Sequence, residues 1–148
     1  TIEKIEIETN PSWLKVCNIE KPKTGLESKF SYKLTAAMSI YGHDTSDLDT
    51  YNDEICFEDK MVNMSDKVTV IPNENLTNTQ SIISIKDSSH DIKNTHNLSD
   101  KIEKNILENK IINKSVSLLS KSKSEKITNM LNEPKSNNVS SLIDCLVS

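Results

Sequence analysis

The sequence predicts an α+β fold, in which a small, mostly antiparallel sheet is covered by one capped amphipathic helix and followed by a helical C-terminal tail. Three observations lead to this fold class. Short β-branched segments with alternating polarity occur near the start and the end of residues 1–86. A helix with recognisable start and stop residues lies between them, and after residue 88 apolar residues recur at helical spacing. We therefore expect an α+β domain at 1–88 and a helical tail at 89–148.

Three segments, near residues 2–8, 67–71 and 81–86, are predicted to be strands. Ile5 and Ile7 alternate with charged residues in the first segment, and β-branched residues favour the pleated surface of a sheet. The other two segments flank a polar loop, so we expect them to pair as an antiparallel hairpin with a long connection. Because a two-stranded hairpin is marginally stable alone, a helix should cover it.

The predicted helix spans residues 25–41. Thr24 and Glu27 have the spacing of a capping box, in which each side chain accepts a backbone N–H near the helix start. Gly42 follows the last apolar position, where a left-handed residue often ends a helix. The apolar residues between these signals share one helical face; they are Phe30, Leu34, Ala37, Met38 and Tyr41. This face should pack against the sheet.

Weaker patterns predict short helical turns around this helix. A turn at 12–16 should carry Trp13 and Val16 inward, and two further turns are expected at 46–51 and 58–64. In the tail, apolar spacing predicts helices that begin at Asn97 or Ser99, near Ser122 and near Val139. Flexible joints are expected at 88–97 and 133–138.

Charge and cysteine usage narrow the classes of function. The chain has 148 residues, a formal net charge of −4 and no arginine, so a basic nucleic-acid surface rich in Arg and aromatic residues is not expected. No apolar run reaches the roughly 18 residues of a membrane span, and none is expected. The cysteines have neither zinc-ligand nor CxxC spacing, which predicts reduced thiols, no metal and a cytoplasmic location, or a mitochondrial one in a eukaryote.

Two segments carry a resemblance to a known family. The first is Pro22-Lys-Thr-Gly-Leu-Glu-Ser-Lys-Phe-Ser31 followed by Ala36-Ala37, and the second is Tyr51-Asn-Asp-Glu-Ile55 followed by Asp66-Lys67-Val68-Thr69-Val70. Together they resemble the C-terminal part of the MmgE/PrpD family, which includes 2-methylcitrate dehydratase, cis-aconitate decarboxylase and iminodisuccinate epimerase. In one departure, Asp87-Ser-Ser-His90 stands where the family usually has a Gly-containing turn before another extended segment.

The resemblance implies the lid domain of a larger enzyme that generally forms a homodimer. The lid would accompany an N-terminal helical domain, on which the 89–148 tail could pack if it does not pack on the lid itself. The implied activity is a cofactor-independent lyase or isomerase reaction on a citrate-like polycarboxylate. The family's main acid and base residues would precede Thr1, so no catalytic residue is expected in this chain, which would be an excised piece of a longer polypeptide.

A lid for such a substrate would hold its carboxylates and exclude water on closing. Lys29 and Ser31 are the best candidates for carboxylate contact, because they lie early in a capped helix whose N-terminus is positive. Tyr32 is a weaker candidate, as a neutral donor. The plainer alternatives are that Lys29 is a solvated surface residue and that Ser31 bonds the local backbone. At the level of the whole chain, the alternatives are a degenerate lid that serves as a protein-interaction module, and an inactive fragment.

Overall fold

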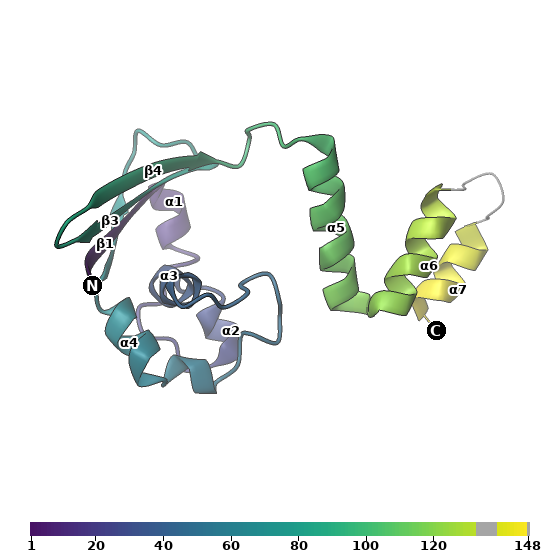
Figure 1. Ribbon diagram of the computed structural model, residues 1–148, viewed down its shortest axis with the longest axis horizontal. Coiled ribbons are helices and arrows are strands. Elements are labelled where there is room, and N and C mark those ends of the chain that lie inside the picture. The colour runs from purple at the N-terminus through teal and green to yellow at the C-terminus, as the bar shows by residue number, and fades with distance from the viewer. Residues whose placement is uncertain (133–138, 148) are drawn as a thin grey trace. The chain divides into compact units, whose positions relative to one another are not determined.

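The computed structural model describes residues 1–132 and 139–147, which form two compact units (Figure 1). The first unit is Thr1–Asp100 and contains a sheet and helices, which confirms the α+β class. The second unit is Lys101–Ser148 and is helical. The joint predicted at 133–138 lies outside the described residues.

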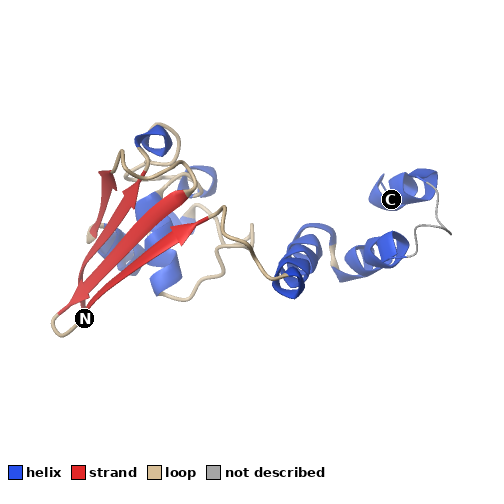
Figure 2. Cartoon of the chain, turned by 90° about the horizontal axis from the view of Figure 1, so that it is seen from above, coloured by secondary structure: helices blue, strands red, loops and turns tan. Residues whose placement is uncertain are grey.

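Four strands form a mixed sheet in the order β2-β1-β3-β4 (Figure 2). β1 (Ile2–Thr9) pairs in parallel with β2 (Val68–Pro72) and antiparallel with β3 (Gln80–Asp87), while β4 (Asp91–Asn97) pairs antiparallel with β3. The predicted hairpin between the second and third strands is therefore wrong, because β1 lies between them. In this order both edges of the apolar strand β1 find backbone hydrogen-bond partners.

β4 replaces the flexible joint that the sequence predicted at 88–97. The carboxylate of Asp87 accepts hydrogen bonds from the backbone N–H groups of Ser89 and His90, each at 2.7 Å, and so closes the turn before β4. β4 is an edge strand, and all of its residues except the last are exposed. Its polar sequence on both faces gave no alternating pattern to predict a strand.

The helices of the first unit lie on one side of the sheet (Figure 2). They are α1 (Pro11–Leu14), α2 (Gly25–Ser28), α3 (Tyr32–Ile40), the short 3₁₀ helix η1 (Glu54–Cys56) and α4 (Asp59–Ser65). α4 confirms the helical turn predicted at 58–64. Residues 46–51 form turns rather than the predicted helical turn, and Trp13 and Val16 are 38% and 51% exposed rather than directed inward.

The helix predicted at 25–41 is two helices. Thr24 caps α2 as predicted by accepting the N–H of Glu27 at 3.2 Å, but the carboxylate of Glu27 accepts the N–H of Lys23 rather than that of Thr24. A second cap, Ser31, then begins α3. Gly42 follows α3 with a φ of +75°, as the left-handed end of the helix requires.

The break between α2 and α3 changes which apolar residues reach the core. Leu34, Ala37 and Met38 are buried as predicted, whereas Phe30 and Tyr41 remain 38% and 43% exposed. The core of the first unit unites the sheet with α3, η1 and α4; its buried residues are Ile5, Ile7, Leu34, Ala37, Met38, Ile55, Cys56, Met61, Met64 and Val68. Burial of this apolar cluster is the main favourable term that holds the helices against the sheet.

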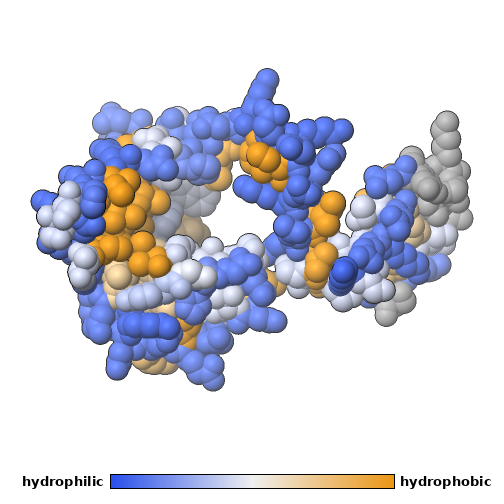
Figure 3. Space-filling model, in the orientation of Figure 1, coloured by the Kyte–Doolittle hydropathy of each residue, from blue (hydrophilic) through white to orange (hydrophobic). Residues whose placement is uncertain are grey.

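The helical layer leaves part of the sheet uncovered. Ile83 pairs with the buried Ile7, and Ile92 pairs with Ile85, so these side chains share the helix-facing side of the sheet. Ile83 and Ile92 are nevertheless exposed, and Figure 3 shows apolar surface between the strands and the helices of this unit.

The second unit contains three helices, α5 (Lys104–Leu119), α6 (Lys121–Asn132) and α7 (Val139–Val147). α6 packs against both α5 and α7. Among the described residues of this unit, the buried ones are Ser124 of α6, whose hydroxyl is hydrogen-bonded to that of Ser115, and Cys145 of α7. α5 begins after Glu103 rather than at the predicted caps Asn97 or Ser99. Within the described residues, no helix has the length and apolarity needed to cross a membrane.

Candidate functional site

The two segments that carry the family resemblance lie against each other in the first unit. The N–H of Gly25 donates a hydrogen bond to a carboxylate oxygen of Asp53 at 2.7 Å. The thiol of Cys56, just after the second segment, lies 3.4 Å from the carbonyl oxygen of Thr24, to which it donates. Residues more than 25 positions apart in the sequence therefore build one local structure around the start of α2.

Gly25 is the closest point of contact between the two segments. A Cβ atom at this position would lie 2.3 Å from the carbonyl oxygen of Tyr51 and 2.9 Å from the Cα of Asn52. Both neighbours are backbone atoms, which cannot rotate away as the end of a side chain can. The close approach of the two segments thus requires glycine at this position.

The positive N-terminus of α2 is already occupied by the chain's own carboxylates. Asp53 accepts the N–H of Gly25, and Glu27 accepts the N–H of Lys23. Lys29 lies at the other end of α2, as its C-terminal cap. Lys29 therefore does not lie early in one long helix, as the sequence predicted, but at the C-terminal end of the short helix α2.

The three predicted substrate contacts have different surroundings. Lys29 is exposed, and its ammonium lies 5.5 Å from the centre of the Tyr51 ring. Ser31 is 1% exposed, and its hydroxyl oxygen accepts the N–H of Leu34 at 3.3 Å, which makes it the cap of α3. The plainer alternative for Ser31, a bond to the local backbone, matches this geometry.

Tyr32 is half-buried and packs against the core of the first unit. Burial raises the pKa of its phenol, and a hydrogen bond with Thr9 offsets part of that effect. The phenol is thus a neutral group tied to β1. Of the three candidates, Lys29 alone is exposed. Its ammonium is therefore the group that remains a candidate for contact with a substrate carboxylate.

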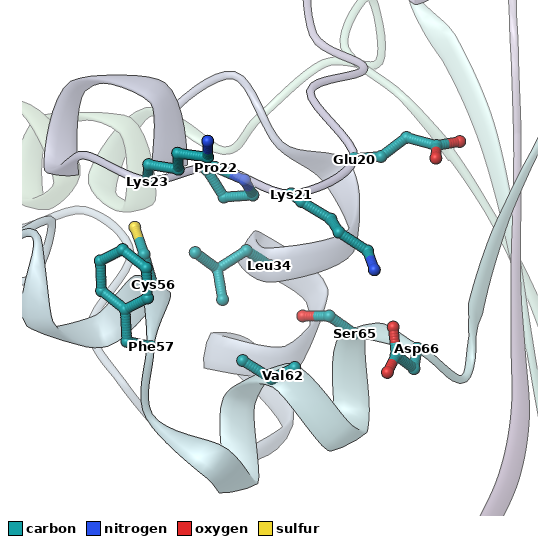
Figure 4. A pocket seen from close by; sticks show the side chains of 10 residues that line it. All are labelled: Glu20, Lys21, Pro22, Lys23, Leu34, Cys56, Phe57, Val62, Ser65 and Asp66. Atoms are coloured by element: carbon teal, nitrogen blue, oxygen red, sulfur yellow. The ribbon is translucent and has the colours of Figure 1, made fainter.

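A pocket of about 260 Å³ opens beside the junction of the two segments (Figure 4). Its walls come from the loop before α2, from α3, from the residues around the end of η1 and from α4. The lining residues are Glu20, Lys21, Pro22, Lys23, Leu34, Cys56, Phe57, Val62, Ser65 and Asp66. None of the three predicted site residues is among them, because no local sequence pattern indicates that the loop before α2 and the end of α4 meet.

The polar groups of the pocket differ in their partners. Glu20 forms an ion pair with Lys33 at 3.8 Å, and its carboxylate points away from the pocket (Figure 4). The hydroxyl oxygen of Ser65 is buried and has no hydrogen-bond partner among the described residues. Burial raises the pKa of the Cys56 thiol, and the negative charges of Asp53 and Glu27 raise it further. Cys56 is thus a protonated thiol and a weak nucleophile.

The described residues contain no group of three His, Cys, Asp or Glu side chains arranged to hold a metal ion. No known protein family matches this chain, and no curated protein matches it either. The resemblance to the MmgE/PrpD family therefore rests on the two sequence segments quoted above.

Proposed function

We propose that this chain is the C-terminal lid of a cytoplasmic, homodimeric MmgE/PrpD-type enzyme, where it helps to bind and enclose a citrate-like polycarboxylate. The reaction is a cofactor-independent dehydration, decarboxylation or isomerisation, and the acid and base groups come from an N-terminal helical domain. The observation that carries the proposal is the packing of the two family-like segments on each other through Gly25 and Asp53.

The fourth strand supports the same proposal. The resemblance places an extended segment after the third strand, and β4 lies at that position. The departure from the family pattern lies in the turn, where Asp87 supplies a side-chain acceptor for two backbone N–H groups in place of a glycine. At this turn the sequence differs from the family pattern, but an extended segment follows the turn, as in the family.

Lys29 is the residue we propose for carboxylate contact. The Tyr51 ring beneath its ammonium contributes about 0.5–1 kcal/mol at an exposed site and limits where the charge can move. The ring face forms no conventional hydrogen bond, so the three N–H donors of the ammonium stay available to carboxylate oxygens. Charge-assisted hydrogen bonds of this kind are about twice as strong as neutral ones.

The test is an activity assay of the complete enzyme that includes the helical domain. We expect turnover of 2-methylcitrate, cis-aconitate or a closely related polycarboxylate without added metal or cofactor. A complete, folded and dimeric product that turns over none of these acids would overturn the enzymatic proposal. That result would favour the second candidate, a degenerate lid that serves as a protein-interaction module.

A further inference from the structure

The pocket beside α4 has the features of a small-molecule site that is separate from Lys29. Its side chains come from four segments of the first unit, and a volume of about 260 Å³ corresponds to roughly nine water molecules at ~30 Å³ each. This is just below the range of about 300–1,000 Å³ that is usual for drug-sized ligands. A ligand that fits it is therefore small.

Ser65 supplies the first observation that points to a ligand. The residue is only 9% exposed, its hydroxyl lacks a hydrogen-bond partner among the described residues, and it points into the pocket (Figure 4). Buried hydroxyl groups in folded proteins nearly always have a partner. A polar atom of a bound molecule would complete the hydrogen bonding of Ser65.

The charged residues at the rim of the pocket indicate which charge that molecule carries. Lys21 points across the pocket toward Ser65 and Asp66 (Figure 4), and within the described part of the chain it forms no ion pair. Lys23 also lines the pocket, while Glu20 is paired with Lys33 and points away. The ammonium of Lys23 points away from the pocket, whereas that of Lys21 reaches across it (Figure 4). The Lys21 ammonium and the Ser65 hydroxyl are hydrogen-bond donors that suit an anion.

The rest of the wall is apolar. Leu34 is buried, whereas Phe57 and Val62 are 64% and 40% exposed although they are large apolar residues at the pocket. An apolar ligand body would cover the two exposed side chains and remove their surface from water.

We propose that this pocket binds a short-chain carboxylate, with the carboxylate between the ammonium of Lys21 and the hydroxyl of Ser65 and the alkyl chain against Leu34, Phe57 and Val62. The site goes beyond the proposed lid function, because it is formed within the first unit and uses neither Lys29 nor a helical domain. Its ligand has one charged head and an apolar body, unlike a polycarboxylate, which is charged throughout.

The experiment titrates this chain with hexanoate and follows backbone amide signals by NMR. Shifts should centre on Cys56, Val62 and Asp66. Lys21→Met should weaken hexanoate binding about tenfold or more, since it removes a charge-assisted hydrogen bond. The matched control is Lys86→Met, at an exposed position of β3 outside the pocket, which should leave the affinity unchanged.

A second variant tests Ser65 by two measurements. Ser65→Ala should weaken hexanoate binding while leaving the Tm of the ligand-free chain unchanged or raising it, because an unpartnered buried hydroxyl is removed. A clear fall in that Tm would show that the hydroxyl already has a partner, and would count against the proposal.

Three further results would overturn the proposal of a carboxylate site. They are no amide shifts with millimolar hexanoate, the same hexanoate affinity in Lys21→Met as in the unaltered chain, or binding of the uncharged 1-hexanol as tightly as hexanoate. Citrate should not compete with hexanoate. Because Lys29 is outside the pocket, hexanoate binding can fail while the lid proposal stands, and the lid proposal can fail while hexanoate binds.

Discussion

Single residues hold the two family-like segments of this chain together. Gly25 allows the backbone of Tyr51 to approach. Its N–H has no helical partner because Gly25 is the first residue of α2, and the carboxylate of Asp53 accepts it. A small increase in the distance between Gly25 and the backbone of Tyr51 would disturb the junction, because the atoms in contact belong to two backbones, which cannot rotate away. The stability of the junction therefore depends on a residue that carries no side chain.

Gly25→Ala should lower the free energy of unfolding by about 3 kcal/mol, the upper part of the usual range for overpacking, because the new methyl group meets backbone atoms. Gly42→Ala is the matched control, since its Cβ would meet no atom within 4 Å and only the φ of +75° is unfavourable. That strain costs about 1 kcal/mol. Urea denaturation measures both, and a Gly25→Ala loss no larger than the Gly42→Ala loss would contradict the close approach.

Lys29→Met in the complete enzyme should lower kcat/KM roughly 30-fold, which corresponds to about 2 kcal/mol of lost substrate contact. The free energy of unfolding should fall by no more than about 1 kcal/mol, the contribution of the contact between the ammonium and the Tyr51 ring at an exposed site. Lys60→Met is the control, since the Lys60 ammonium also lies over a tyrosine ring, at 5.7 Å from that of Tyr41, but away from the junction. Equal kinetics in the two variants would leave Lys29 a solvated surface lysine.

At the scale of secondary structure elements, the sequence predicted those parts of the fold in which a local signal and burial agree. The cap at Thr24, the stop at Gly42 and the alternating β1 were all predicted, because each is a pattern over a few neighbouring residues. The break at Ser31 was missed, since the apolar spacing continues across it while the capping hydrogen bond interrupts the helix.

Strand pairing and the formation of pockets depend on contacts between residues far apart in the sequence, which no local sequence pattern predicts. β4 was missed because its residues are polar on both faces, and the position of β1 between β2 and β3 is a property of the whole sheet. Lys29 could be singled out from the resemblance, whereas the pocket residue Ser65 could not. Its environment is set by the loop at 20–23, more than 40 positions away in the sequence.

The turn between β3 and β4 should depend on pH through Asp87. Hydrogen bonds from the N–H groups of Ser89 and His90 lower the pKa of this carboxyl from its ordinary value of 3.8. A lowered folded-state pKa means that the ionised carboxylate stabilises the turn above the unfolded pKa, and that this stabilisation is lost as the pH falls through the folded pKa.

The Tm difference between the unaltered chain and Asp87→Ala should therefore shrink as the pH falls below about 4, where the carboxylate becomes protonated. Ser88→Ala changes a neighbouring exposed turn residue without a titratable group, and its Tm difference should not vary in this way. Thermal unfolding over this pH range measures both. A difference for Asp87→Ala that does not shrink below about pH 4 would contradict the assignment of the turn to the carboxylate.

At the scale of the whole molecule, the first unit holds the sheet, the core, the family-like junction and the pocket, and the second unit holds α5, α6 and α7. The functional groups that the first unit presents are an exposed ammonium and a small pocket lined by lysines. Such groups bind and orient carboxylates, whereas elimination of water or carbon dioxide also needs a positioned base and acid. We therefore propose that this chain binds the substrate and that the proposed N-terminal helical domain breaks the bonds.

The most direct measurement compares turnover of 2-methylcitrate and cis-aconitate by three proteins: this chain, the helical domain alone and the complete enzyme. The account predicts turnover only in the complete enzyme. Any residual kcat/KM of the helical domain alone should be below that of the complete enzyme by more than the roughly 30-fold loss assigned to the Lys29 contact, and so be too low for measurable turnover. Turnover by this chain that survives repeated purification, or equal kcat/KM with and without it, would contradict the assignment of this chain as a substrate-binding lid.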